Sequence, residues 1–290
     1  MKKVYYALIL LTVLMFGGCF ALKDVYRKQR GSNLKISLQF TCISSVAGLV
    51  VLIAINGFKF EYTPFTLLMA LLVAINGFLF SFCSFKALDS VNLSVYSLFS
   101  MLGGMALPFV QGIAFYGEPM TVAKSVCFVI ITVALLMTVE KGEKKNGTPY
   151  YIGVFVLNGM SGVLSKIYAS SNFEKASAAG YSILSAICSV VLSALILAIF
   201  FRAKDDTPKE NPLSVAVCAA SGITNRVANF ILVIALSHVD ASVQYPMVTG
   251  GVMIVSTLIC FFGDKKPSKR EVLSIAVAFV GMLALFLIKC

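Results

Sequence analysis

Hydrophobic residues in this chain gather into long uninterrupted runs separated by short polar segments. Ten of these runs reach about 20 residues, the length that an α-helix needs to cross the hydrocarbon core of a bilayer. They are residues 4–22, 36–55, 65–85, 91–115, 120–139, 150–168, 176–201, 212–236, 241–262 and 271–288. The longest segments between them, such as 140–149 and 202–211, are about ten residues rich in Lys, Asp, Gly and Pro. The pattern predicts an all-α membrane protein with ten transmembrane helices and no extramembrane domain.

The composition agrees with a lipid environment. Hydrophobic residues make up 59% of the chain, charged residues 13%, and the mean hydropathy is +0.90. A chain with so little polar surface cannot cover an apolar core in water. The net charge of +11 is explained by attraction of the loops to anionic lipid, so no nucleic-acid partner is expected.

The second half of the chain repeats features of the first. The stretch 87–139 resembles 235–287 at an offset of about 148 residues. Matching positions include Gly103 and Gly251, Met105 and Met253, and Pro119 and Pro267. The first and sixth spans match through Tyr5–Tyr6 and Tyr150–Tyr151, Met15 and Met160, and Gly17 and Gly162. We therefore predict two five-helix repeats, residues 1–145 and 146–290, which together form one transmembrane domain.

The N-terminus carries a pattern that also occurs in exported proteins, and the chain has several cysteines. Lys2 and Lys3 precede an apolar stretch that ends in Gly17-Gly18-Cys19, a pattern similar to a lipoprotein signal with its cleavage cysteine. Because the first span matches the sixth, we expect it to be retained. The eight cysteines show no metal-binding spacing and seven fall one apiece in different spans, so buried thiols are expected and no metal site.

An odd number of spans per repeat has a mechanical consequence. The second copy enters the bilayer from the side opposite to the first, so the two halves should be inverted about an axis in the membrane plane. Inverted halves can rock against each other around a site near the midplane and expose it to each face in turn. The repeat therefore favours a transporter with alternating access.

These features together resemble a known family. Both copies start with Ala-Leu, followed after four residues by Leu or Ala and then by a Ser-Val pair, Pro108 lies in the fourth span, and Gly117-Glu118 precedes the fifth. With ten spans in a five-plus-five repeat, the chain resembles the EamA-type branch of the drug/metabolite transporter superfamily. The resemblance implies a carrier of amino acids, other metabolites, nucleotide sugars or phosphorylated sugars, and we expect it in the bacterial inner (plasma) membrane. The second half departs from the motif, with Asp264 in place of Glu.

Polar residues inside spans are costly and therefore informative. In the sixth span, Asn158, Ser161, Gly162, Ser165 and Lys166 fall at helical spacing along one face, which should look into the bundle. Lys166 is close enough to the end of this span to extend its ammonium to the interface.

The eighth span holds the costliest residue. Arg226, flanked by Asn225 and Asn229, lies near the middle of residues 212–236, where a charged side chain costs about 2.5–3.5 kcal/mol. Two interpretations stay open: the guanidinium bonds carbonyls or an acid as structural glue, or it lines a cavity and binds a substrate anion. We predict a substrate-binding set of Arg226, Asn225, Asn229, Asn158, Ser161, Lys166, Tyr245, Gln244, Tyr96 and Asn76. The last four could equally serve in helix packing.

The distribution of acidic residues narrows the substrate class. All 13 lie in loops or within about a turn of a predicted span end, so no carboxylate is expected near mid-membrane. A cationic multidrug exporter is therefore disfavoured, and a substrate with a carboxylate or phosphate, anionic or zwitterionic like an amino acid, is favoured. No Gly-x4-Gly-Lys-Ser/Thr loop is present, so no ATP or other cofactor is expected, and energy should come from a gradient or from exchange.

One short motif in the sixth span is typical of a different function class, an intramembrane protease. Gly159-Met160-Ser161-Gly162 is similar to the nucleophile motif of rhomboid intramembrane proteases, which would pair Ser161 with His238. Because His238 is expected at a helix end and Ser161 midway along one, we predict a protein that is not an enzyme. A channel or scaffold and a homodimer stay open.

Orientation in the membrane is read from the basic residues. Sixteen of the 24 Lys and Arg residues, Lys23 and Lys265 among them, follow odd-numbered spans, and six lie at the termini or after even-numbered spans. The positive-inside rule then places the odd-numbered loops in the cytoplasm and both termini outside. The family resemblance implies the opposite orientation.

Overall fold

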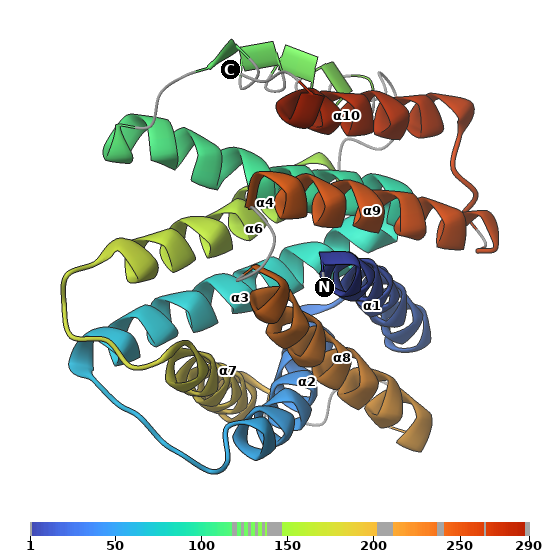
Figure 1. Cartoon of the computed structure of the whole chain (residues 1–290). Coiled ribbons are helices and arrows are strands. Elements are labelled where there is room, and N and C mark those ends of the chain that lie inside the picture. The colour runs from blue at the N-terminus through green and yellow to red at the C-terminus, as the bar shows by residue number, and fades with distance from the viewer. Residues whose placement is uncertain are drawn as a thin grey trace.

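The computed structural model describes residues 2–290 except 118–120, 123–124, 127–128, 131–132, 135–136, 138–146, 202–210, 237–240, 264 and 288–290. Within that part of the chain the fold is all-α (Figure 1). The helices are α1 (Lys2–Arg30), α2 (Leu34–Ile55), α3 (Pro64–Ser90), α4 (Leu93–Tyr116), α6 (Thr148–Ser170), α7 (Ala178–Phe200), α8 (Pro212–Leu236), α9 (Ala241–Phe261) and α10 (Lys269–Leu287). Eleven of the 20 residues of the fifth predicted span, 120–139, lie outside the described residues.

Seven of the described helices are long and apolar enough to cross a membrane, and Met247–Phe261 of α9 forms a shorter apolar helix. The protein is therefore an integral membrane protein of helical type. The helix starts follow local chemistry, because the side chain that precedes each start accepts a hydrogen bond from the backbone N–H three residues on. These side chains are Asn33, Thr63, Asn92 and Ser177. Gly117 ends α4 in a left-handed conformation, with φ of 63°.

The first helix is longer than its hydrophobic run predicts. The run ends at residue 22, but α1 continues to Arg30. The sequence therefore misplaced Lys23, which belongs to the helix and not to the loop that follows it. Asp24, predicted within about a turn of the span end, lies six residues before the end of α1. Asp24 forms ion pairs with Arg27 and with Lys28, and these pairs between successive turns favour the longer helix.

Helix packing closes a ring. Following each helix to its packing neighbours gives the order α1, α8, α2, α7, α3, α6, α4, α9 and back to α1, with α10 outside against α9 (Figure 1). Helices whose numbers differ by five can be exchanged in this order: α1 with α6, α2 with α7, α3 with α8, and α4 with α9. The exchange gives the same ring of neighbours, with the helices in reverse order.

Glycines permit the closest helix contacts in this ring. A Cβ on Gly103 of α4 would collide with the backbone carbonyl of Phe155 on α6, and one on Gly222 of α8 would collide with the carbonyl of Ser44 on α2. Backbones that approach so closely leave no room for a side chain, as is usual between transmembrane helices.

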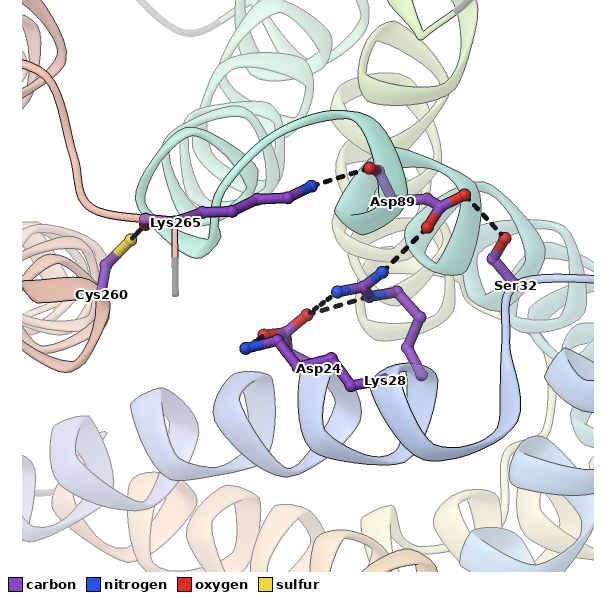
Figure 2. Close-up of polar contacts among 7 residues, drawn as sticks. Asp24, Lys28, Ser32, Asp89, Cys260 and Lys265 are labelled. Atoms are coloured by element: carbon purple, nitrogen blue, oxygen red, sulfur yellow. Dashed lines mark hydrogen bonds and ion pairs between the residues drawn. The ribbon is translucent and has the colours of Figure 1, made fainter. Parts of the chain in front are cut away.

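One end of the bundle is tied by charges, and we call it the Asp89 end. Asp89, at the end of α3, accepts from Arg27 at 2.9 Å and from Ser32 at 3.1 Å, and its backbone carbonyl accepts from Lys265 at 2.8 Å (Figure 2). Lys265 lies between α9 and α10, so these contacts join the first and second halves of the chain. Asn92, at the start of α4, donates to Glu271 of α10 at 2.8 Å.

The opposite end, which we call the Glu61 end, is tied by loop contacts. Glu61 accepts from the backbone N–H of Ser177 at 2.6 Å, and the Thr63 hydroxyl donates to the carbonyl of Glu174 at 3.1 Å. The hydrogen bonds from Ser177 lower the pKa of the Glu61 carboxyl. Both ends therefore carry contacts between the two halves.

Candidate anion-binding site

The polar stripe of α6 is used for packing between helices. The Asn158 amide donates to the carbonyl of Ser100 on α4 at 2.6 Å. From α3, the Asn76 amide donates to the carbonyl of Leu157 at 2.9 Å and to the hydroxyl of Ser161 at 2.8 Å. Ser161 in turn donates to Leu157 at 3.3 Å. Three predicted substrate ligands thus hold α6 between α3 and α4.

Two further polar side chains of α4 also lie in helix interfaces. Tyr96 is fully buried, its hydroxyl donates to Ser84 of α3 at 3.0 Å, and its ring meets Phe20 of α1 edge-on. The Gln111 amide donates to the carbonyl of Val163 on α6 at 3.5 Å. In this conformation both side chains fill the core of the bundle.

Lys166 lies near the Glu61 end of α6. Its ammonium is 5.0 Å from the centre of the Tyr116 ring at the end of α4, and the side chain is half-buried. A cation above an aromatic ring is attracted to the ring's negative face. This placement fits a residue that extends toward the interface, as the sequence favoured.

The polar residues of α8 have a different environment. Seven residues are about two turns of a helix, so residues seven apart lie on the same face. Asn225 is seven residues after Cys218, and Asn229 is seven after Gly222, and both earlier residues are buried against neighbouring helices. Both asparagines are nevertheless exposed, and among the described residues the Asn229 amide donates only to Asn225 of its own helix, at 2.8 and 3.3 Å. The inner face of α8 is therefore covered near Cys218 and uncovered near Asn229.

Arg226 lies across the neighbouring helix α2. A Cβ added to Gly48 would be 2.7 Å from Cγ of Arg226 and 3.4 Å from its Nε, so the arginine occupies the space that a side chain at Gly48 would take. Gly48 is two residues from both Val46 and Val50, which are exposed, and thus lies about 200° from them on the inner side of α2. Among the residues that the structure describes, none makes a hydrogen bond or ion pair with this guanidinium.

Lys23 is a second embedded cation, which hydropathy missed because it follows the last apolar residue of the first run. Its ammonium is 4.9 Å from the centre of the Phe80 ring on α3 and 5.5 Å from that of Phe40 on α2. The signal that could have identified it is the continuation of helix-favouring and paired charged residues through Arg30.

The remaining predicted residues lie in or beside parts of the chain that the structure does not describe in full. Gln244 and Tyr245 lie near the start of α9, where the structure describes the backbone alone. His238, the partner that a protease would need for Ser161, lies outside the described residues. The described site therefore consists of Arg226, Asn225 and Asn229 of α8, with Gly48 of α2 beneath the arginine and Lys23 closer to the Asp89 end.

Guanidinium and ammonium groups inside a helical bundle can bind an anion through charge-assisted hydrogen bonds, and amide groups beside them can orient the rest of a small molecule. In the described spans the only acidic side chains are those near the Asp89 end, where Asp24 and Asp89 already pair with cations. The site therefore offers positive charge and hydrogen-bond donors, the groups to which an anion binds.

Comparisons with known proteins identify the fold alone. No family model matches the chain, and no curated protein matches it. A solved structure described as "Crystal structure of protein" superposes with a TM-score of 0.60 at 18% sequence identity, and the match covers 96% of this chain and 94% of the other. The two proteins share an arrangement of helices over nearly their whole lengths.

Proposed function

We propose that this protein is a secondary transporter of the EamA type, which carries a small metabolite bearing a carboxylate or phosphate across the bacterial inner membrane by alternating access. Its two halves are residues 1–145 and 146–290, inverted with respect to each other. Arg226 binds the acidic group of the substrate, and Asn225 and Asn229 orient the remainder. The proposal needs no cofactor and no catalytic group.

The order of helices around the ring supports inverted halves. A two-fold axis in the membrane plane turns one half over onto the other and reverses the direction in which the ring is followed. The ring maps onto itself with this reversal when helices five places apart are exchanged. Glycines at matched positions agree with the exchange, since Gly17 of α1 packs on α9 and Gly162 of α6 packs on α4.

The observation that carries the proposal is the placement of Arg226. A guanidinium in a bilayer is tolerated where it pairs or faces a hydrated cavity. Here it lies over Gly48 on the inner side of α2, without a partner among the described residues, beside two exposed asparagines. A substrate anion supplies the missing partner.

The test combines binding and transport. Purified protein is screened by thermal shift against amino acids, organic phosphates and nucleotide sugars, and each compound that stabilises it is tested for counterflow in proteoliposomes. We expect Arg226→Gln to weaken binding by about tenfold to a hundredfold, the loss of one charge-assisted contact, and Arg226→Lys to retain part of it. Trans substrate should accelerate uptake, because a carrier exposes one site to both sides and a channel does not.

An unchanged affinity in Arg226→Gln, measured on protein with a wild-type melting temperature, would exclude the guanidinium as the anion ligand. Flux that trans substrate leaves unchanged would favour a channel over a carrier.

A further inference from the structure

Lys23 faces the interior of the ring. It lies nine residues after Leu14 and two before Val25, both exposed, and these spacings place it on the side of α1 opposite to them. Its ammonium lies over the phenyl groups of Phe40 on α2 and Phe80 on α3, and both helices belong to the helix ring that contains α1. The lysine is therefore directed away from lipid.

Lys23 and Arg226 lie over one face of α2. Lys23 is above Phe40, Arg226 crosses Gly48, and Ser44 between them touches α8. Residues 40, 44 and 48 are each four apart, so they share a face, and the two cations contact positions about 12 Å apart along the helix axis. Both cations thus flank the inner side of the same helix.

Neither cation has an acidic partner in the described structure. The Lys23 ammonium, like the guanidinium of Arg226, makes no hydrogen bond or ion pair with a described residue, although the adjacent Asp24 pairs with Arg27 and Lys28. A substrate with one negative charge would neutralise one cation and leave the other embedded and uncompensated, which is costly.

We propose that the substrate is a dianion with two separated acidic groups, a dicarboxylate or a phosphorylated carboxylic acid, and that Lys23 binds the second group while Arg226 binds the first. This inference rests on the proposed function and narrows its substrate class. The aromatic rings of Phe40 and Phe80 hold the ammonium in place by cation–π attraction before the substrate arrives.

The first experiment uses the unmodified protein. Thermal shift and isothermal titration compare succinate, glutarate and adipate with butyrate, valerate and hexanoate, and 3-phosphoglycerate with glycerate. We expect at least one dianion to bind about tenfold more tightly than its matched monoanion, since a second charge-assisted contact contributes on that scale. The inference is overturned if no dianion binds, or if each monoanion binds as tightly as its dianion.

The second experiment assigns the effect to Lys23. Lys23→Gln should reduce the dianion preference to about one, while Lys23→Arg should keep it, because a guanidinium carries the same charge and also stacks on aromatic rings. Lys28→Gln is the matched control, a lysine of the same helix that pairs with Asp24 near the Asp89 end, and it should keep the preference. A lysine that only stabilises the fold would lower the melting temperature of the free protein in Lys23→Gln and leave the preference intact, which would contradict the assignment.

The two proposals can fail separately. If Arg226→Gln abolishes binding of dianions and monoanions alike and Lys23→Gln changes neither, the transporter proposal stands and the dianion inference fails. If neither variant alters binding and no counterflow is seen with any compound, both the dianion inference and the proposed transport function fail.

Discussion

Helices α6 and α8 both carry polar side chains along one face, but these side chains have different partners. In α6, Asn158 and Ser161 exchange hydrogen bonds with α4 and α3. In α8, Asn229 bonds only to its own helix, and Arg226 has no described partner. The bonds from α6 to its neighbours stabilise the bundle, whereas Arg226 and Asn229 of α8 bond to no other helix in the part of the chain that the structure describes. A polar stripe alone does not distinguish these uses.

We expect the largest loss of stability from a substitution that disrupts the packing of α6 against α4. Gly103→Ala places a methyl group against the backbone carbonyl of Phe155, which cannot move without separating α4 from α6. Overpacking of this kind costs about 1–3 kcal/mol or more. We expect a clear fall in melting temperature and in the yield of monodisperse protein, measured by size-exclusion chromatography in detergent. Gly18→Ala is the control, because no atom lies within 4 Å of a Cβ there.

A substitution that faces α8 should lower stability less. Gly48→Ala also adds one methyl group, but its nearest neighbour is the flexible side chain of Arg226, at 2.7 Å from Cγ. The arginine side chain must shift, and the backbone carbonyl of Gly222, 3.3 Å from the added methyl group, must give by a few tenths of an ångström. We therefore expect a smaller fall in melting temperature than for Gly103→Ala, while anion affinity falls by about threefold to tenfold. Titration of the stabilising anion into both proteins measures the difference. An unaltered affinity would mean that the guanidinium does not need its place above Gly48.

Asn158→Ala tests whether the polar side chains of α6 serve helix packing and not substrate binding. It removes the hydrogen bond to Ser100 and should lower stability by about 0.6–1 kcal/mol, the usual size for such bonds between transmembrane helices. Anion affinity should not change. A variant that folds as well as wild type but binds substrate poorly would return Asn158 to the binding site, as the sequence first suggested.

The smallest effect concerns the loop after α6. Hydrogen bonds from Ser177 lower the pKa of Glu61 in the folded protein, so its contribution to stability is present at neutral pH and is lost as the pH falls through that lowered pKa. Glu61→Gln should therefore melt slightly below wild type at pH 7, and the gap should close on acidification. Melting curves at several pH values test this, and a gap that widens at low pH would contradict it.

Much of the fold could be predicted from the pattern of apolar runs. For α2 and α8 the predicted and observed bounds differ by at most two residues, because a hydrophobic run between polar caps determines a transmembrane helix locally. The prediction was wrong at the end of α1, where paired charges extend the helix beyond its apolar run. For the candidate site, the sequence singled out Arg226 as the costliest residue and predicted Asn158 as a substrate ligand beside it, whereas in the structure the Asn158 amide bonds to Ser100 of α4.

By itself the sequence determined that the chain lies in a bilayer as helices, because each run must satisfy its backbone hydrogen bonds internally wherever water is absent. It also determined which side chains are expensive there. Only the tertiary structure decided which of these have partners, since Ser100 and Gly48 reach Asn158 and Arg226 from distant parts of the chain. The energy of an embedded polar group depends on what faces it across the helix interface, and spacing along one helix carries no information about its neighbour.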